Sequence, residues 1–405
     1  MKRSIFSSLI LLASAFSCVT PQSSDVPQSG ERSLVLVESY PFESGLDEPD
    51  IAKTSDVWIE MVKQSKAQID IMQQYANIIT NRSPSMDKFL AELKKAHKRG
   101  VRVRILLGEH MIPRSETIAA SVDLLKSIPG FEVRVTDRWK GSDGILHAKF
   151  MTVDRRTAYL GSANMDWKAL DHIKELGFKI QEPHLVKSLQ AVFEDDWKNF
   201  DKKDNIVQNL PKNLSQSVDC SWSLNPCQAF LAVSPGGMGI DSSQWELTYL
   251  LEYIASAETT IDIATYRYKQ IFWGKERKFL EIEHALEKAL AKGVQVRLLL
   301  DPRHKPEYFT NLLARGAEIK TVSFPDHSSG PMTYARLVHA KYLVVDHKKI
   351  WMGTSNFSGG YFYFGRNIGI FVESKEIANK VSHIFKKYWN SSYSQVVEPS
   401  SHAAH

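Results

Sequence analysis

The chain has 405 residues, of which 43% are hydrophobic and 10% are aromatic. This length and composition exclude a disordered or fibrous protein and predict a large core, in two domains or two fused halves. The formal net charge of +5 results from 51 basic and 46 acidic residues. So mild a balance does not indicate a nucleic-acid-binding protein, and any anion-binding surface has to be local.

The first 18 residues have the pattern of an export signal. Two basic residues precede an apolar stretch, residues 5–16, that is too short to span a bilayer. The stretch leads to Cys18 in a context that resembles the lipidation box of bacterial lipoproteins, although Ala15 and Phe16 depart from it. We expect export to the bacterial cell envelope and a membrane tether through a lipid on Cys18. The alternative is a periplasmic or secreted protein with an unmodified thiol.

Composition divides the rest of the chain. Residues 19–32, rich in serine, proline and glutamine, predict a flexible tether. The polar segment 202–228 predicts an irregular linker, and residues 395–405 predict a disordered tail. Two folded repeats, residues 33–201 and 229–394, remain.

The other two cysteines, Cys220 and Cys227, lie close together in the predicted linker. In an exported chain this closeness predicts a short disulfide loop. Two cysteines without a nearby pair of histidines do not make a four-ligand set, so we expect no metal site. After the export signal, no stretch of the sequence is long and apolar enough to predict a membrane span.

The two halves of the chain repeat one another. Residues 69–71 (IDI) return as residues 261–263, and residues 99–107 (RGVRVRILL) return as residues 292–300 (KGVQVRLLL). Each half predicts helices that alternate with strands, and a last helix that ends the half. The sequence therefore predicts an α/β fold in which two similar sandwiches are joined.

A set of polar residues repeats in the same register. In each half, a histidine and a lysine two positions apart are followed by an aspartate, and then by a glycine, a hydroxyl residue and an asparagine. Side chains two apart on an extended segment point to the same face. The pairs are His147 and His339, Lys149 and Lys341, Asp154 and Asp346, Ser162 and Thr354, and Asn164 and Asn356.

This duplicated HxKxxxxD pattern resembles the signature of the phospholipase D superfamily, and the resemblance extends from about residue 34 to residue 392. It implies two α/β/α sandwich halves related by a pseudo-two-fold axis, with one active site between them. A single chain then suffices to complete the site. Residues 36–39, 159–167 and 353–357 are most similar to the lysosomal branch of the superfamily, whose members act as 5′-exonucleases on single-stranded nucleic acid.

The resemblance implies a phosphodiesterase that needs no metal or cofactor. Cationic and amide side chains neutralise the phosphate oxygens, one histidine attacks phosphorus to form a phosphohistidine, and the other protonates the leaving oxygen. Asp154 and Asp346 are expected to support the site. The expected phosphate-binding residues are Lys149, Lys341, Asn164, Asn356, Ser162 and Thr354.

The family places a carboxylate about 28 residues after the nucleophilic histidine, where it holds the correct tautomer. This position holds Glu175 in the first half and Asn367 in the second. We therefore expect His147 to be the nucleophile and His339 to be the acid.

The sequence leaves three functions open, which differ in their substrate or ligand. A nuclease is favoured by aromatic residues that could stack on bases, and Arg336 and Arg366 could add phosphate contacts. Core packing is the alternative role for each aromatic residue. A phospholipase D or phosphatidyl transferase would use the same central residues, and a noncatalytic envelope protein would bind anionic lipid or nucleic acid. The aromatic residues are Tyr75, Trp167, Tyr266, Tyr361, Phe362 and Tyr363.

Overall fold

The computed structural model describes residues 33–203, 206–222, 225–272, 277–304 and 306–398. The predicted export signal with Cys18, and the predicted tether 19–32, lie outside the described residues and stay predictions. Within the described part, no helix combines the length and the hydropathy that a membrane span requires.

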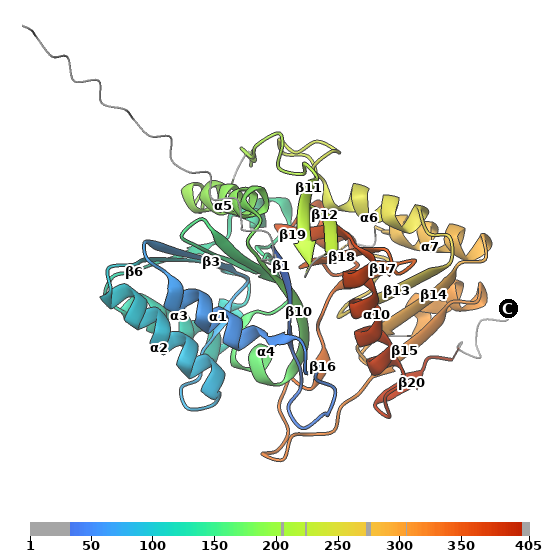
Figure 1. The fold of residues 1–405 in the computed structure, drawn as a ribbon, viewed down its shortest axis with the longest axis horizontal. Helices are drawn as coiled ribbons and strands as arrows, with labels where there is room; N and C mark the ends of the chain where they lie inside the picture. Colours follow the sequence, from blue (N-terminus) through green and yellow to red (C-terminus); the bar gives the residue numbers. More distant parts are fainter. Residues whose placement is uncertain (1–32, 204–205, 223–224, 273–276, 305, 399–405) are drawn as a thin grey trace, which may run out of the picture.

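The described chain forms two similar halves that lie side by side (Figure 1). The first half, coloured blue to green, contains one large mixed sheet with helices on both faces. The second half, coloured yellow to red, repeats this plan. The predicted pair of α/β/α sandwiches is confirmed.

In the first half, amphipathic segments form the helices and Val/Ile/Leu-rich segments form the central strands. The helices are α1 (Thr54–Gln64), α2 (Pro84–Lys98), α3 (Glu116–Ser127), α4 (Trp167–Asp171) and α5 (Pro183–Lys198), with 3-10 turns at Ile112–Arg114 and Arg138–Ser142. The strands are β1 (Leu34–Ser39), β2 (Ala52–Lys53), β3 (Gln68–Gln73), β4 (Ala76–Asn77), β5 (Arg102–Gly108), β6 (Phe131–Thr136), β7 (Phe150–Val153), β8 (Thr157–Gly161), β9 (Met165–Asp166) and β10 (Ile173–Ile180).

The main helices and strands of the second half follow in the same order as those of the first. Its helices are α6 (Glu246–Ala255), α7 (Glu281–Ala291), α8 (Thr310–Ala314), α9 (Gly359–Tyr363) and α10 (Lys375–Trp389), with a 3-10 turn at Pro306–Phe309. Its strands are β11 (Val218–Trp222), β12 (Asn225–Ser234), β13 (Thr260–Thr265), β14 (Gln295–Leu300), β15 (Glu318–Val322), β16 (Leu337–Val338), β17 (Tyr342–Val345), β18 (Lys349–Gly353), β19 (Asn367–Glu373) and β20 (Ser394–Val396).

The strand orders of the two sheets correspond. The first sheet runs β2-β1-β10-β8-β7-β3-β5-β6, and the second runs β11-β12-β19-β18-β17-β13-β14-β15-β20. The short strands β4 and β9 pair separately. Strands β7 and β17, which precede the aspartates of the two histidine motifs, lie at the centres of their sheets. Each of these strands is therefore paired with a neighbouring strand on both sides.

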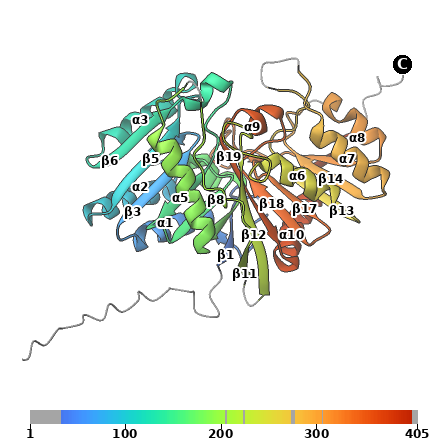
Figure 2. The ribbon, with the colours of Figure 1, turned by 90° about the horizontal axis from the view of Figure 1, so that it is seen from above.

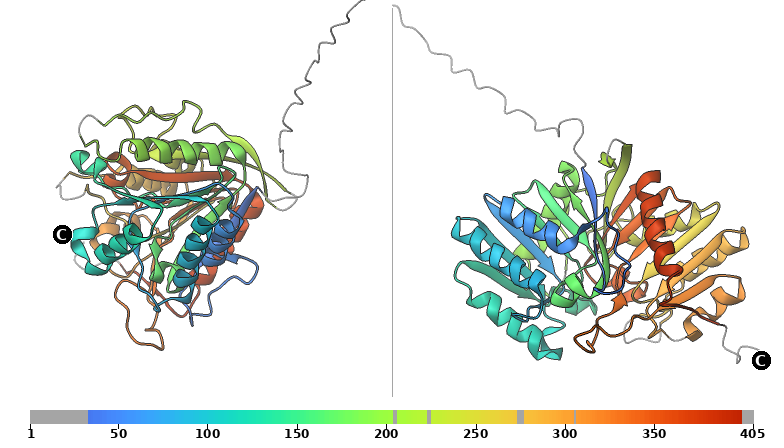
Figure 3. Two further views of the ribbon diagram at one scale, coloured as in Figure 1. Left: turned by 90° about the vertical axis from the view of Figure 1, so that its left-hand side faces the viewer. Right: turned by 60° about the horizontal axis from the view of Figure 1, so that its bottom comes forward.

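Each sheet buries one face under its own helices and the other face in a shared core. Helices α1 to α4 cover one face of the first sheet, and α6 to α8 cover the matching face of the second. Helices α5 and α10 pack with strands of both sheets in one continuous apolar cluster. In Figure 2 the two halves meet where β1 lies next to β11, and Figure 3 shows the two halves from two further sides.

Two boundaries predicted from the sequence are wrong. The last part of the predicted linker 202–228 is regular, because β11 and β12 form a hairpin in which Cys220 pairs with Cys227. The two cysteines form the predicted disulfide, with 4.8 Å between their Cα atoms. The predicted tail 395–405 begins inside β20, which pairs with β15 at the edge of the second sheet.

A buried ionic cluster joins the halves beside the shared core. Asp196 of α5 accepts hydrogen bonds from Arg366 of the second half at 2.7 Å and from Arg138 at 2.7 Å. Asp195 also accepts from Arg138, at 3.0 Å. Both guanidinium groups are at most 2% exposed, so their charges depend on these carboxylates.

We expect Asp196→Ala to lower the free energy of unfolding by about 3–5 kcal/mol, because it leaves two buried guanidinium groups with too few acceptors. Urea unfolding measures the change. Glu132→Ala is the matched control, since it breaks a half-exposed ion pair with Arg102 and is expected to change stability by less than about 1 kcal/mol. Equal effects of the two substitutions would contradict the role given to Asp196.

Candidate active site

Each histidine motif leads into a central strand. His147 and Lys149 lie immediately before β7, and His339 and Lys341 lie between β16 and β17. His147, Lys149 and Lys341 are at most 2% exposed. The side chain of His339 is 12% exposed, which makes it the more accessible histidine.

Asp154 and Asp346 support the backbone and do not reach the other motif residues. Both occupy turns with positive φ, of 52° and 51°, directly after β7 and β17. Each carboxylate accepts three backbone N–H groups from the start of a neighbouring strand, at 2.7–2.9 Å. These donors are Lys66, Ala67 and Gln68 for Asp154, and Glu258, Thr259 and Thr260 for Asp346.

Each histidine is held by a residue of the opposite half. The Nδ1 atom of His339 lies 2.7 Å from Oε1 of Glu175. The Nδ1 atom of His147 lies 2.9 Å from Oδ1 of Asn367. The site is therefore complete only where the two halves meet.

Backbone pairing between the halves explains this crossed arrangement. Strand β16 pairs in parallel with the start of β10, and His339 donates its backbone N–H to Lys174 at 2.9 Å, next to Glu175. In the same way His147 donates its backbone N–H to Arg366 at 2.9 Å, next to Asn367. Each histidine is thus brought beside a strand of the other repeat.

The basis for the predicted nucleophile is therefore wrong. The prediction paired Glu175 with His147 of the same half, but the carboxylate contacts His339. Sequence spacing gave the correct position for the carboxylate and the wrong partner, because the pairing crosses the pseudo-two-fold axis. The same chemical reasoning now favours His339 over His147 for the predicted role of nucleophile.

The hydrogen bonds also determine the tautomers. Asn367 donates through Nδ2 to the carbonyl oxygen of Tyr361 at 2.8 Å, so its Oδ1 is the acceptor toward His147. The Nδ1 atom of His147 then carries hydrogen. Glu175 is an acceptor toward His339, which leaves Nε2 of both imidazoles for chemistry.

Burial controls the charge of the histidine pair. Burial lowers the pKa of His339 to about 4, against the opposing effect of Glu175. The pKa of His147 is likewise held well below its ordinary value by burial, by Lys149 and by Lys341. Burial raises the pKa of Glu175, but His339 and Lys341 outweigh it and hold the carboxyl ionised. Above about pH 5 the substrate-free site therefore holds neutral histidines beside a carboxylate.

The two lysines meet in the same site. Lys149 donates to the carbonyl oxygen of His147 at 2.7 Å, and Lys341 donates to that of His339. Burial lowers the pKa of Lys341 to about 7, and Arg267 adds to the decrease. Burial and Lys341 lower the pKa of Lys149 well below its ordinary value. An anion bound between the two lysines would relieve this repulsion.

The downstream motif residues take two different roles. Asn164 and Asn356 are buried, and Asn164 reaches the hydroxyl of Tyr75 at 3.4 Å. Ser162 and Thr354, predicted to bind phosphate, instead hydrogen-bond the backbone of β10 and β19. Thr354 also donates to Oδ1 of Asn367 at 3.0 Å. These hydroxyls position the strands that hold the histidines, and the phosphate-binding role expected of them stays a prediction.

The predicted aromatic residues separate into site and core. The ring of Tyr266 lies 4.9 Å from that of His339, and the ring of Tyr361 lies 4.8 Å from that of His147. Tyr75 donates to Asp166 at 3.1 Å beside Asn164. The remaining three are core or packing residues, as the alternative held: Trp167, Phe362 and Tyr363.

The two predicted phosphate-binding arginines are engaged elsewhere. Arg366 is fully buried and bonded to Asp196 and Gln208. Arg336 donates to the carbonyl oxygens of Pro325 and Phe42, where it anchors a surface segment. Both predictions are therefore wrong, because protein acceptors already occupy the guanidinium groups.

Sequence reasoning missed two polar residues of the site. Gln74 accepts from Lys149 at 3.3 Å. Arg267 is half-buried, affects the pKa of Lys341 and Tyr361, and has no carboxylate partner among the residues that the structure describes. Neither belongs to the repeated pattern, which was the signal that revealed the others.

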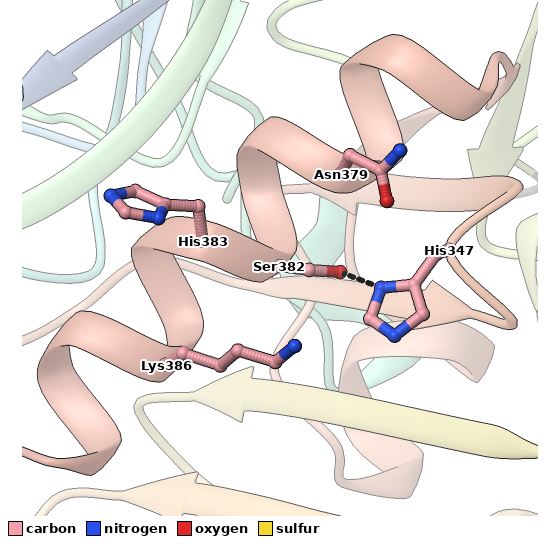
Figure 4. A pocket seen from close by; sticks show the side chains of 5 residues that line it. All are labelled: His347, Asn379, Ser382, His383 and Lys386. Atoms are coloured by element: carbon pink, nitrogen blue, oxygen red, sulfur yellow. Dashed lines mark hydrogen bonds between the residues drawn. The ribbon is translucent and has the colours of Figure 1, made fainter.

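A further polar pocket opens on the surface of the second half. His347, Asn379, Ser382, His383 and Lys386 line it, and His347 Nδ1 lies 2.7 Å from Ser382 Oγ (Figure 4). His347 follows Asp346 at the end of β17 remote from His339. The pocket therefore contains none of the paired motif residues.

Comparisons with known proteins agree with this geometry. The family described as "Cardiolipin synthase, PLD-like domain" matches twice, over residues 58–197 and 250–389. The chain belongs to the phospholipase D family. It is thus an enzyme of the phosphodiesterase class, with one domain of the family in each half.

Relatives in the family differ in their named activities. The chain is 30% identical over 403 residues to the human "5'-3' exonuclease PLD3", covering 90% of the chain and 81% of that protein. It is also 30% identical over 389 residues to the "Virion nicking-joining enzyme" of vaccinia virus, covering 89% and 88%. Its fold is similar to that of phosphatidylserine synthase from Haemophilus influenzae, with a TM-score of 0.61, 15% identity and coverage of 84% and 85%.

We expect a tetrahedral dianion to bind more weakly as pH rises, because the pKa of Lys341 is about 7 without ligand and increases when an anion binds. Tungstate affinity, measured by calorimetry, should fall at least about tenfold between about pH 6.5 and pH 8.5. Calorimetry at the higher pH in two buffers of different ionisation enthalpy should show proton uptake.

The control for this titration is Lys386→Met, which removes a cation from the remote pocket of Figure 4. It should leave the tungstate titration unchanged. Tungstate affinity that does not vary with pH would contradict the account of the lysine pair.

Proposed function

We propose that the protein is a metal-independent phosphodiesterase that acts through a phosphohistidine on His339, and that its substrate is single-stranded nucleic acid, cleaved from the 5′ end. The observation that carries the mechanism is the crossed pair of hydrogen bonds, Glu175 to His339 and Asn367 to His147. Lys149 and Lys341 supply positive charge for the phosphate oxygens.

In the first step, Nε2 of His339 attacks phosphorus, and the bond to the leaving oxygen breaks. The imidazole gains positive charge as the P–N bond forms, and the ionised Glu175 on its Nδ1–H stabilises that charge. His147, protonated when the anionic substrate binds, gives its Nε2 proton to the leaving oxygen. Its neutral partner Asn367 orients the ring without making it a stronger base.

In the second step His147 acts as a base and His339 is the leaving group. His147, now neutral, takes a proton from water, and the water oxygen attacks phosphorus. The P–N bond breaks and returns neutral His339. Asn164 and Asn356 are buried at equivalent positions of the two repeats and supply amide donors to the phosphate oxygens in both steps.

The relatives support nucleic acid as the substrate. The two relatives at 30% identity carry names that describe cleavage or joining of nucleic-acid strands, and the chain covers most of each. The ring of Tyr266 next to His339 is partly exposed and gives a surface on which a base can stack. Arg267 adds a cation near this ring.

Phospholipid is the second candidate substrate. A relative named "Probable phospholipase D F09G2.8", from Caenorhabditis elegans, is 28% identical over 396 residues, covering 89% of the chain and 70% of that protein. The central chemistry would be unchanged, with water or an alcohol in the second step.

The proposed site of action is outside the cytoplasm, in the cell envelope. The Cys220–Cys227 disulfide supports export, because such bonds persist in oxidising compartments.

We expect residues 19–405 to cleave end-labelled single-stranded DNA in excess EDTA, with release of mononucleotides from the 5′ end, and to leave phosphatidylcholine vesicles intact. His339→Asn should abolish cleavage. Choline release without DNA cleavage would move the assignment to phospholipase D, and turnover of neither substrate would contradict an enzymatic role.

The two histidines should respond differently to a good leaving group. With a p-nitrophenyl phosphodiester of thymidine, His147→Asn should release one nitrophenolate per enzyme and then stop, because this leaving group needs no proton but the second step needs a base. His339→Asn should release none. A burst from His339→Asn instead would show that His147 is the nucleophile.

A further inference from the structure

Tyr334 is a large aromatic side chain held in solvent near the active site. It is 65% exposed, and its backbone φ is +57°, a conformation that a tyrosine rarely adopts. The surrounding segment is anchored on both sides. Lys168 donates to the carbonyl oxygen of Thr333 at 3.1 Å, and Arg336 donates its backbone N–H to His172 at 2.8 Å. The backbone that carries the ring is therefore held in place by the fold, at a conformational cost.

Arg303 connects this ring to the site. Its guanidinium carbon lies 5.4 Å from the ring centre of Tyr334 and 5.3 Å from that of Tyr266. Asp301, which is 2% exposed, binds the guanidinium through both oxygens at 2.7 and 2.9 Å. The guanidinium group thus lies near both tyrosine rings, and the Arg303 side chain is still 46% exposed.

Tyr266 completes a path from solvent to the nucleophile. Its hydroxyl lies 3.2 Å from Nη2 of Arg303, and its ring lies 4.9 Å from the ring of His339. Lys341 lies 5.5 Å from the same ring centre. The series Tyr334, Arg303 and Tyr266, called the aromatic–arginine stack below, therefore leads from an exposed ring to the phosphate site.

We propose that the aromatic–arginine stack is a nucleobase subsite, which binds a base next to the scissile phosphate by stacking and selects unpaired strands. This inference rests on the proposed nuclease function and names the feature of the substrate that is recognised. Rings and guanidinium planes stack on any base, since every base has a π-face. A paired base inside a duplex cannot offer that face to a protein.

The charge of the stack favours a base over a choline headgroup. An aromatic cage for a quaternary ammonium needs rings without a competing cation. Here the guanidinium carbon of Arg303 already lies 5.3 and 5.4 Å from the two ring centres. The stack therefore favours a flat, neutral or anionic partner.

The test compares oligothymidylate with an abasic strand of the same length and phosphodiester backbone, using kcat/KM for each. The wild-type enzyme should prefer the strand with bases by about tenfold or more. Tyr334→Ala should reduce this preference about tenfold, and Tyr334→Trp should retain it. Arg303→Lys should also reduce it, because a lysine keeps the charge without the plane. The control is Arg315→Met, at a half-exposed arginine paired with Glu287, and it should leave the preference in kcat/KM unchanged.

The outcomes separate the two proposals. A wild-type enzyme that cleaves both strands equally well would overturn the subsite and leave the nuclease standing. The subsite would likewise be overturned, and the nuclease left standing, if Tyr334→Ala slowed the cleavage of both strands by the same factor. A wild-type enzyme that cleaves neither strand would overturn the nuclease and the subsite together.

Discussion

The crossed hydrogen bonds between the halves are the constraint on which the active site depends. Glu175 holds His339, Asn367 holds His147, and in each case a backbone hydrogen bond to the adjacent residue sets the position. Each half supplies one histidine and the residue that orients the histidine of the other half. The shared core and the Asp196 cluster therefore contribute to catalysis indirectly, because they keep the halves in this register.

One difference between the repeats makes a symmetric fold chemically asymmetric. A buried carboxylate beside His339 can stabilise a positive imidazole, whereas the amide of Asn367 can only orient His147. The two lysines are equivalent in position, and their buried charges oppose each other until an anion arrives. The fold thus supplies a symmetric phosphate site, and in the proposed mechanism a single pair of residues decides which histidine attacks.

The repeat made much of this predictable from the sequence. Matching positions revealed both histidines, both lysines and both asparagines, and alternating segments revealed the two sandwiches. The partner of Glu175 was not predictable from spacing, because its position depends on how two halves pair across an axis. Arg366 was misjudged, since nothing in the sequence reveals that Asp196 of a distant helix binds it. Arg303 and Tyr334 lie in segments that do not repeat, so the comparison of halves gave no signal for them.

The most direct test of the account is to locate the covalent intermediate. The His147→Asn variant, mixed with a p-nitrophenyl phosphodiester of thymidine, is digested under alkaline conditions that preserve phosphohistidine, and its peptides are mapped by mass spectrometry. The account predicts the nucleotidyl group on the peptide that contains His339. Modification of any other residue, or a fully unmodified protein after a burst of nitrophenolate, would contradict it.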